Sequence, residues 1–79
     1  MTAEMTAAEI ARRIEAALPG ARAQVSGEAA HFSAVVIASA FAGRSRVEQH
    51  KMIYDLFRDE MACEAIHALA LRTSIPPEN

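Results

Sequence analysis

The sequence predicts an α+β fold, in which a three-stranded sheet carries helices packed on one face. The first observation is the order of periodic segments: one helical, two strand-like, one long helical and a final strand-like segment. The second is composition, because 52% hydrophobic and 23% charged residues allow a packed core and are atypical of disorder. The third is length, since a domain of 79 residues buries only about 60% of its unfolded surface. We therefore expect one domain over residues 1–79, with a thin core over about residues 7–75 and short tails.

A capping box predicts the start of the first helix. Thr6 and Glu9 can each accept a hydrogen bond from an otherwise unpaired backbone N–H there. Apolar residues then recur at every fourth position, at Ile10, Ile14 and Leu18. The side expected to be exposed carries Arg12, Arg13 and Glu15. Pro19-Gly20 should end the helix.

Three further segments have the character of strands. Residues 21–25 alternate between apolar and polar, which is typical of an edge strand, and residues 26–30 are expected to form a turn. Residues 32–41 contain an unbroken apolar run, which predicts a central strand with little exposure on either face. Residues 66–72 predict the third strand, which the prolines at 76 and 77 should end. Together they would form an antiparallel or mixed sheet.

The second helical region begins with another capping box. Gly43 ends the preceding strand, and Ser45 with Glu48 predicts a helix from Arg46. Its apolar face consists of Val47, His50, Ile53, Tyr54 and Phe57, with Met61 extending it. Periodicity leaves open whether the region is one helix or two with a bend. We expect His50 on this face to be a buried, hydrogen-bonded structural residue.

Composition and motifs also limit the class of function. The net charge of −2 argues against a whole surface that attracts phosphates. No apolar run approaches the roughly 20 residues of a membrane span and no leader pattern precedes the domain, so we expect a cytoplasmic protein that binds no membrane. The single Cys63 permits no internal disulfide, which fits a reducing compartment. Enzyme motifs such as GxSxG and HExxH do not occur in the sequence, which argues against an enzyme.

The histidines and the cysteine are the candidate metal ligands. None of His31, His50, His67 and Cys63 lies in a tight ligand pair such as CxxC or HxxxH. His31 and His67 would converge at one sheet edge if the first two strands form a hairpin that the third strand joins. Two ligands would leave a metal unsaturated, so another molecule would have to complete the site. The residues alone leave open whether each side chain is a ligand or a structural residue.

A local basic group surrounds the start of the second helix. Arg44, Arg46 and Lys51 lie where unpaired backbone N–H groups also attract anions. A solvated helix start explains this pattern as well as phosphate binding does, and no aromatic residues are interleaved for base stacking.

Several motifs in a fixed order resemble the BolA family. They lie in VSGEAAHFSAVVIASAFAGRSRVEQHKMIYDLF and in IHALALRTSIPPE. The motifs are His31-Phe32 at the opening of a strand, a Phe41-x-Gly43 turn, His50 in the next helix and the strand residues Ile66-His67-Ala68. The resemblance covers about residues 7–78, and the short turn at residues 26–30 resembles the subgroup with a compact loop.

The resemblance implies the order αββααβ of a class II KH-like fold, with two helices between residues 46 and 63. It also implies binding to a monothiol glutaredoxin through a bridging [2Fe-2S] cluster. In the family the strand histidine, here His67, is a ligand, and a second comes from Cys or His in the first loop. This loop has no cysteine and Gln24 stands where a relative carries histidine, so His31 is the nearest candidate and Cys63 an outside one. The glutaredoxin cysteine and glutathione supply the other ligands.

The resemblance therefore leads us to expect a non-enzymatic adaptor in iron-sulfur trafficking or iron regulation. Such a protein is a monomer without cofactor when alone, and it shares the cluster with glutaredoxin and glutathione. The alternative implied by the family is a DNA-binding transcriptional regulator of stress response or morphology, using Arg44, Arg46 and Lys51 on the KH-like fold. The segment GRSR lacks the second glycine of the GXXG loop with which KH domains grip nucleic acid.

Overall fold

A computed structural model describes residues 5–77, so residues 1–4 and 78–79 of the expected tails lie outside the described residues. The elements are α1 (Ala7–Ala17), β1 (Arg22–Glu28), β2 (His31–Ile37), the 3-10 helix η1 (Ser39–Phe41), α2 (Arg46–Leu56), α3 (Arg58–Ala62) and β3 (Ala68–Ser74). The long helical region is thus divided into α2 and α3, as the family resemblance implied.

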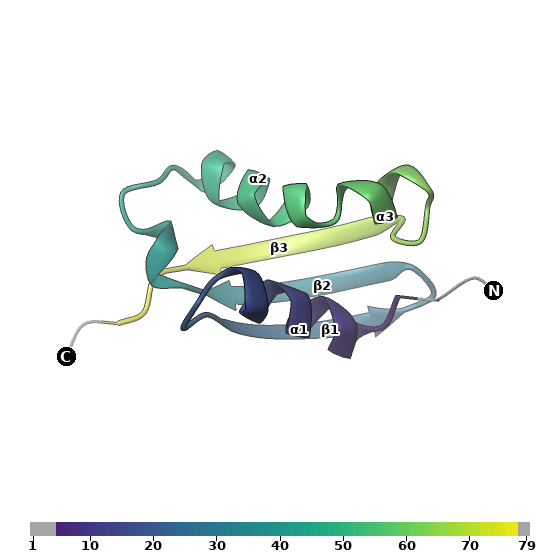
Figure 1. Ribbon diagram of the computed structural model, residues 1–79, viewed down its shortest axis with the longest axis horizontal. Coiled ribbons are helices and arrows are strands. Elements are labelled where there is room, and N and C mark those ends of the chain that lie inside the picture. The colour runs from purple at the N-terminus through teal and green to yellow at the C-terminus, as the bar shows by residue number, and fades with distance from the viewer. Residues whose placement is uncertain (1–4, 78–79) are drawn as a thin grey trace.

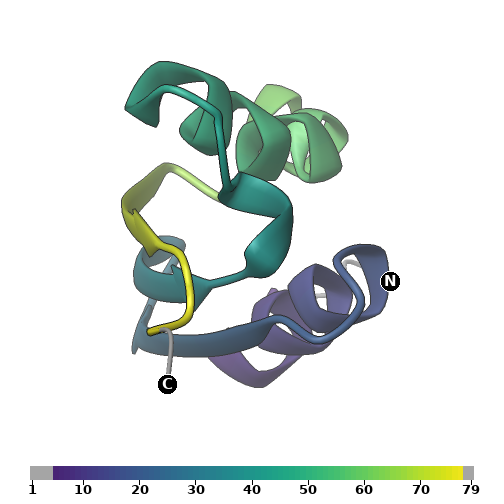
Figure 2. The same cartoon turned by 90° about the vertical axis from the view of Figure 1, so that its left-hand side faces the viewer.

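The three strands form a mixed sheet with the order β1-β2-β3. β1 and β2 form an antiparallel hairpin, whereas β3 runs parallel to β2 after the crossover through α2 and α3. β2 is therefore the central strand, as predicted. Figure 1 shows α1 lying over the hairpin and α2 and α3 beside β3, and the end view in Figure 2 places the helices on the same side of the sheet. The predicted fold class is confirmed.

The core lies between this helical layer and one face of the sheet. β2 alternates between buried and exposed positions, with Phe32, Ala34 and Val36 buried. The expectation that β2 is shielded on both faces is wrong, because Val35 on the opposite face is 39% exposed. Helices cover only one face of the sheet, so the apolar residues 35–37 point alternately to the open face and to the core. Other large core side chains are Ile10, Ile14, Phe41, Ile53, Phe57, Ile66 and Leu69.

The strand boundaries differ from the expected ones. β1 continues to Glu28, so the turn before β2 consists of only Ala29 and Ala30 instead of five residues. β2 ends at Ile37, and the buried Phe41 lies in η1 and not in the strand. β3 begins and ends two residues later than expected, at Ala68–Ser74.

Both long helices begin at the predicted capping residues, although only the second capping box is complete. The Thr6 hydroxyl accepts a hydrogen bond from the backbone N–H of Glu9 at 3.1 Å, but the Glu9 carboxylate pairs with Arg12. At α2 the box is complete, because Ser45 and Glu48 each accept from the other's backbone N–H, at 3.2 and 2.9 Å. This double contact fixes the first turn of α2 against the loop before it.

The apolar face of α2 is narrower than the sequence predicted. Ile53 and Phe57 are buried, but Val47 is 76% exposed. In the first turns of α2, the half-buried side chain of Gln49 points toward the interior, and that of Val47 does not. The predicted burial of Val47 is therefore wrong, because α2 lies over the edge strand β3 and its first turn reaches beyond the core.

Arg13, expected to be exposed, instead joins α1 to the other two helices. Its guanidinium donates to the Glu60 carboxylate at 2.8 Å and to the Leu56 carbonyl at 2.7 Å. The same group lies 4.7 Å from the ring centroid of Phe57. Arg13 thereby contacts the end of α2, the start of α3 and the core aromatic between them.

Side chains from the helices also reach both edges of the sheet. Glu15 of α1 accepts a hydrogen bond from the backbone N–H of Ala23 in β1 at 3.0 Å. On the opposite edge the Tyr54 hydroxyl donates to the Leu69 carbonyl of β3 at 2.8 Å. Each edge strand therefore has one outward backbone group bound by a helix.

Candidate functional site

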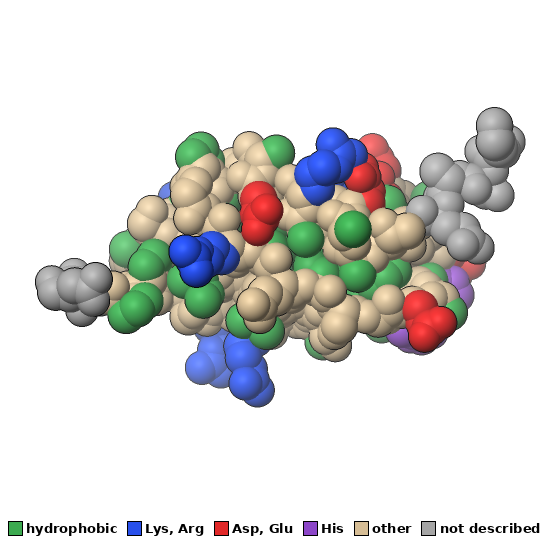
Figure 3. Space-filling model, turned by 90° about the horizontal axis from the view of Figure 1, so that it is seen from below, with side chains coloured by type: hydrophobic (Ala, Val, Ile, Leu, Met, Phe, Trp, Pro, Cys, Tyr) green, Lys and Arg blue, Asp and Glu red, His purple; other side chains and the backbone are tan. Residues whose placement is uncertain are grey.

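His31 and His67 lie side by side at one end of the sheet. Their imidazole centroids are 5.8 Å apart, their ring planes are tilted by 57°, and both residues are exposed. His31 is the first residue of β2, and His67 directly precedes Ala68, which is the register partner of His31. The expected convergence of the two imidazoles is present, but at an end of the sheet and not along an edge, because His31 opens the central strand. Figure 3 shows histidine surface at the right-hand end of the molecule.

The hairpin turn fixes this arrangement through the backbone. Ala29 and Ala30 have φ values of 55° and 69°, the positive sign that a two-residue type I′ turn requires. The Ala30 carbonyl then accepts hydrogen bonds from the backbone N–H groups of His67 and Ala68, at 2.7 and 3.1 Å. The segment carrying His67 is therefore tied to the turn that directly precedes His31.

The spacing of the two rings fits a shared metal. A metal bound by a ring nitrogen at about 2.0–2.1 Å lies about 3.2 Å from the ring centroid, so two rings on one metal have centroids at most about 6.4 Å apart. The 5.8 Å between His31 and His67 is below that limit and about 0.6 Å above the roughly 5.2 Å of a tetrahedral metal, so a small rotation of the exposed rings would let them share one. Among residues 5–77, no three His, Cys, Asp or Glu side chains lie close enough to form a metal site. The pair can supply two ligands of a larger set.

Cys63, the outside candidate, lies apart from any such group. It is exposed at the C-terminal cap of α3, where its thiol donates to the Glu60 carbonyl at 3.7 Å. The next residue, Glu64, has a φ of 65°, so the chain leaves the helix in the left-handed conformation. A role for Cys63 as a ligand would need another molecule to supply the remaining donors.

His50 lies on α2, away from the histidine pair. It is half-buried and lines a hollow with Arg46, Leu71, Arg72 and Thr73. The expectation that it is buried is wrong, and its side chain makes no hydrogen bond within residues 5–77. The beginning of α2 stands over the edge of β3, which leaves one side of the imidazole open to solvent.

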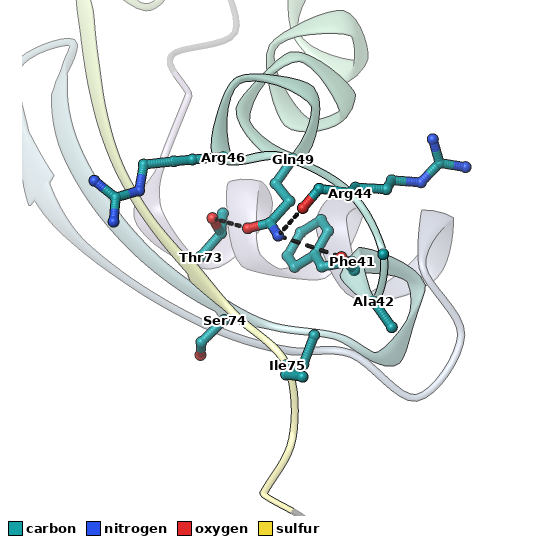
Figure 4. A pocket seen from close by; sticks show the side chains of 9 residues that line it. Phe41, Ala42, Arg44, Arg46, Gln49, Thr73, Ser74 and Ile75 are labelled. Carbon is teal, nitrogen blue, oxygen red and sulfur yellow. Dashed lines mark hydrogen bonds between the residues drawn. The ribbon is translucent and has the colours of Figure 1, made fainter.

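The basic residues at the start of α2 do not form one cluster. Figure 4 shows the Arg46 side chain reaching toward β3 and the Arg44 side chain pointing away from it. Lys51 is exposed more than a full helical turn beyond Arg46. Arg46 instead shares a hollow of about 320 Å³ with Arg72 of β3.

Arg72 and Arg22 extend this basic surface across the open face of the sheet. Arg72 is opposite Val35, and Arg22 is opposite Ile37, so they flank the end of the central strand on the same face. Within the described part of the chain, neither of them forms an ion pair, and the same holds for Arg44 and Arg46. Sequence reasoning missed Arg22 and Arg72, although strict alternation along each strand places them with the polar, outward positions.

A second hollow, of about 470 Å³, lies where the loop before α2 meets the end of β3. The Gln49 amide donates to the carbonyls of Phe41 and Arg44 at 3.2 and 2.9 Å, and its oxygen accepts from the Thr73 hydroxyl at 2.6 Å. Figure 4 shows this network forming one wall of the hollow, with Ile75 on the other side. Gln49 was not singled out from the sequence, where it reads as an ordinary polar helix residue.

Within residues 5–77, every helix is too short or too polar to span a bilayer.

Comparison with known proteins identifies the family. The family described as BolA-like protein matches residues 4–78. A solved bolA protein homologue from Coxiella burnetii is 33% identical, with a TM-score of 0.78 and coverage of 91% of this chain and 92% of that one. The BolA domain of SufE1 from Arabidopsis thaliana is 28% identical, with a TM-score of 0.77 and coverage of 89% and 91%.

One curated relative carries a functional name but is matched only in part. The DNA-binding transcriptional regulator BolA from Haemophilus influenzae is 36% identical over 52 residues, 66% of this chain and 50% of that protein. The chain spans from 13% to 64% of the length of the curated relatives it matches, which is below two thirds in each case. Nearly the whole chain nevertheless matches the family, and its fold agrees with solved members. The chain therefore belongs to the BolA-like protein family.

Proposed function

We propose that this chain is a non-enzymatic adaptor that binds a monothiol glutaredoxin and shares a bridging [2Fe-2S] cluster with it. The observation that supports this most directly is the exposed pair of His31 and His67, with ring centroids 5.8 Å apart. Two imidazoles leave an iron-sulfur cluster short of ligands, so a partner must supply the others. Membership of the BolA-like family favours a glutaredoxin as that partner, acting in cytoplasmic iron-sulfur trafficking or iron regulation.

In this proposal His67 is the principal ligand and His31 the second. The hydrogen bonds from His67 and Ala68 to the Ala30 carbonyl hold the two histidines on a common backbone frame. Such a frame lowers the cost of ordering the ligands when the partner arrives. When bound, the cluster is the shared cargo, and histidine in place of thiolate raises its reduction potential.

The test is anaerobic reconstitution of the cluster with a monothiol glutaredoxin and glutathione. The mixed complex should show visible absorption and circular dichroism that differ from those of the glutaredoxin alone. His67→Ala should abolish this difference, and His31→Ala should weaken or shift it, because each removes an imidazole ligand.

Two variants serve as controls. His50→Gln changes a histidine outside the pair and should leave the mixed spectrum unchanged, and Cys63→Ser asks whether the thiol contributes. An unchanged mixed spectrum in His67→Ala would contradict the proposal. Loss of the spectrum in Cys63→Ser, with His31→Ala unaffected, would assign the second ligand to Cys63.

The second candidate function is binding of DNA as a transcriptional regulator. The specific observation in its favour is the group of unpaired arginines at the opposite end of the sheet, where Arg46 and Arg72 share a hollow. Among the described residues, two carboxylates accept hydrogen bonds from backbone N–H groups, Glu15 from Ala23 and Glu48 from Ser45. The family relationship to a protein named as a DNA-binding regulator supports the same function.

DNA binding predicts a steep loss of affinity with salt, because phosphate contacts release counterions. Neutralising Arg46 and Arg72 together should weaken binding of duplex DNA and reduce the slope of log affinity against log salt by about two. Neutralising Arg12 and Arg58, which already form ion pairs on helix surfaces, is the matched control. An absence of measurable binding at low salt would remove this candidate.

A further inference from the structure

We propose that the hollow between α2 and β3 binds a terminal phosphate group, the dianionic end of a phosphate monoester. The hollow has a volume of about 320 Å³, and its lining consists of Arg46, His50, Leu71, Arg72 and Thr73. The site uses neither histidine of the exposed pair. It shares two arginines with the DNA candidate, but its ligand is a terminal phosphate and requires no duplex. Either function can therefore fail without the other.

The first observation is an excess of positive charge in the hollow. Arg46 comes from α2 and Arg72 from β3, and within residues 5–77 neither forms an ion pair. The described residues that line the hollow include no carboxylate. Two like charges in one hollow repel each other, and a bound anion would replace this repulsion by attraction. A phosphate monoester carries a charge of about −1.5 to −2 at pH 7, which matches the two guanidinium groups.

The second observation is the supply of hydrogen-bond donors from side chains. Each guanidinium presents its N–H groups in a planar fork that can bind two phosphate oxygens at once. His50 lies four residues after Arg46, on the same side of α2. Its half-buried imidazole makes no hydrogen bond within the described residues. Since even a neutral imidazole has one N–H donor, this ring can bind a further phosphate oxygen.

The third observation is the free edge of β3 that borders the hollow. β3 is an outer strand, so every second residue directs its backbone N–H and carbonyl away from β2. The Leu69 carbonyl is one of these groups, because the Tyr54 hydroxyl binds it from α2. The N–H of Leu71, two residues later, therefore points the same way, toward the hollow that Leu71 lines. It adds a backbone donor to those of the side chains.

The fourth observation is that the two walls of the hollow are tied together. On one side the Gln49 amide oxygen accepts a hydrogen bond from the Thr73 hydroxyl at 2.6 Å. On the other, one helical turn beyond His50, the Tyr54 hydroxyl donates to the Leu69 carbonyl at 2.8 Å. The fold therefore sets the separation of the backbones that carry the two arginines. A ligand has to order only side chains, which lowers the cost of binding.

The test is a titration of the full chain with sodium phosphate at constant ionic strength and about pH 8, where phosphate is mainly a dianion. In NMR spectra, the ring protons of His50 and the backbone amide of Leu71 should shift along one saturable curve. The ring protons of His31 and His67 should not shift. Calorimetry should give one site per chain. Shifts that do not saturate, or shifts confined to His31 and His67, would overturn the site.

Variants separate a defined site from general attraction between opposite charges. Arg46→Gln and Arg72→Gln should each weaken phosphate binding about tenfold, because each removes a charge-assisted contact. Arg44→Gln causes the same change in net charge at an exposed arginine whose side chain points away from β3 (Figure 4), so it is the matched control. It should weaken binding less than about twofold. Equal weakening in all three variants, with unchanged far-ultraviolet circular dichroism, would show general attraction only and overturn the proposal.

Two small esters test the preference for a terminal phosphate. Methyl phosphate, a dianion, should bind as inorganic phosphate does. Dimethyl phosphate, a monoanion with the diester linkage of the DNA backbone, should bind about tenfold more weakly because it carries half the charge. Equal affinities for the two esters would overturn the terminal phosphate as the ligand.

Oligonucleotides distinguish the two sources of such a group. If tetrathymidylate with a 5′-phosphate binds no more tightly than methyl phosphate, the site takes a small phosphate ester. Tighter binding, lost when the 5′-phosphate is replaced by a hydroxyl, would identify the end of a nucleic-acid strand. Saturable phosphate binding by a protein without affinity for duplex DNA that lacks terminal phosphates would remove the DNA candidate and leave this site intact.

Discussion

The hairpin turn beside His31 has backbone conformations that alanine rarely adopts. Ala29 and Ala30 are in the left-handed region, where an L-residue costs roughly 1–2 kcal/mol relative to its usual conformations. In the preceding strand, Gly27 has a φ of 121°, and an added Cβ would lie 2.2 Å from the His31 carbonyl oxygen. The residues just before His31 therefore combine unfavourable backbone conformations with close packing.

Replacing Ala29 with glycine should stabilise the protein. Glycine adopts positive φ without strain, and this gain exceeds the extra entropy of the unfolded chain. We expect Ala29→Gly to raise the free energy of unfolding by about 0.5 kcal/mol in denaturant titrations. The same substitution at Ala8, exposed in the first turn of α1, should lower it by about 0.5 kcal/mol, less than the cost in a helix interior. A decrease for Ala29→Gly would contradict the assigned turn.

From the sequence we could predict that the two histidines come together, but not the distance between them. That His31 and His67 share a sheet edge followed from the expected hairpin and third strand. Their separation depends on the register of His31 with Ala68 and on a two-residue turn, and the five-residue turn that was expected would have placed His31 differently. Arg72 was missed because its proximity to Arg46 depends on where α2 lies over β3, which the sequence pattern does not specify.

At the scale of elements, a few side chains join segments that are distant in the sequence. Gln49 of α2 binds the loop that ends β2 and the last residues of β3 through three hydrogen bonds. Arg13 of α1 binds α3 and the end of α2 in a similar manner. Both side chains are partly buried, where such bonds contribute more than they do on a fully exposed surface.

Gln49→Ala should therefore destabilise the connection between α2 and β3. Its removal leaves the carbonyls of Phe41 and Arg44 and the Thr73 hydroxyl without their partner, and we expect a loss of about 1–2 kcal/mol. Thermal and urea denaturation measure the change. Gln24→Ala, on the exposed side of β1, is the matched control and should change stability by less than about 0.5 kcal/mol. Equal effects of the two variants would show that the network is not stabilising.

The contact between Arg13 and Glu60 should make stability depend on pH. The hydrogen bond from Arg13 lowers the pKa of Glu60 below its usual value of 4.5. The folded state therefore favours the charged carboxylate, so the stabilisation is fully present above pH 4.5 and is lost as pH falls through the lowered pKa.

Glu60→Gln should cost about 1 kcal/mol at pH 7, an estimate reduced for the 33% and 24% exposure of the two side chains. Its stability should also fall less than that of the unaltered protein between neutral and acidic pH. Glu64→Gln, which changes an exposed carboxylate without an ion pair in the described part of the chain, is the control. Parallel pH profiles for Glu60→Gln and the unaltered protein would contradict the assignment.

Helix starts were predictable because their signals are local. Ser45 and Glu48 form the expected capping box, and Thr6 caps α1. Strand ends were predicted less well, because pairing with a neighbouring strand extends β1 to Glu28 beyond its alternating segment. The division of this region into two helices followed from the family resemblance, whereas the position of the break at Phe57 was not predicted, since hydrophobic periodicity continues across it.

At the scale of the whole molecule, one core connects every layer. Buried residues from α1, β2, η1, α2 and β3 form a single cluster, and the partly buried Ala23 and Val25 of β1 pack against it. The crossover from β2 to β3 passes through α2 and α3, so pairing of the two parallel strands depends on helices that also enclose the core. No layer has a separate core among residues 5–77 that would keep it folded alone.

Unfolding should accordingly be a single cooperative transition. Fluorescence of Tyr54, the one tyrosine in a chain without tryptophan, reports on the contact between α2 and β3, and far-ultraviolet circular dichroism reports on all elements. The two signals should give the same midpoint, with a calorimetric enthalpy near 55 kcal/mol at about 60 °C from the average per residue. Separate midpoints would show that α2 leaves the sheet before the remainder unfolds.

The bonds at the sheet edges have a consequence for aggregation. A three-stranded sheet has two open edges, and an unoccupied edge is a template onto which another chain can add a strand. Glu15 on the N–H of Ala23 and Tyr54 on the carbonyl of Leu69 each occupy a position where such growth would begin. Addition of a further strand at either lateral edge would have to displace a helix side chain first, which makes fibril-like polymerisation less favourable.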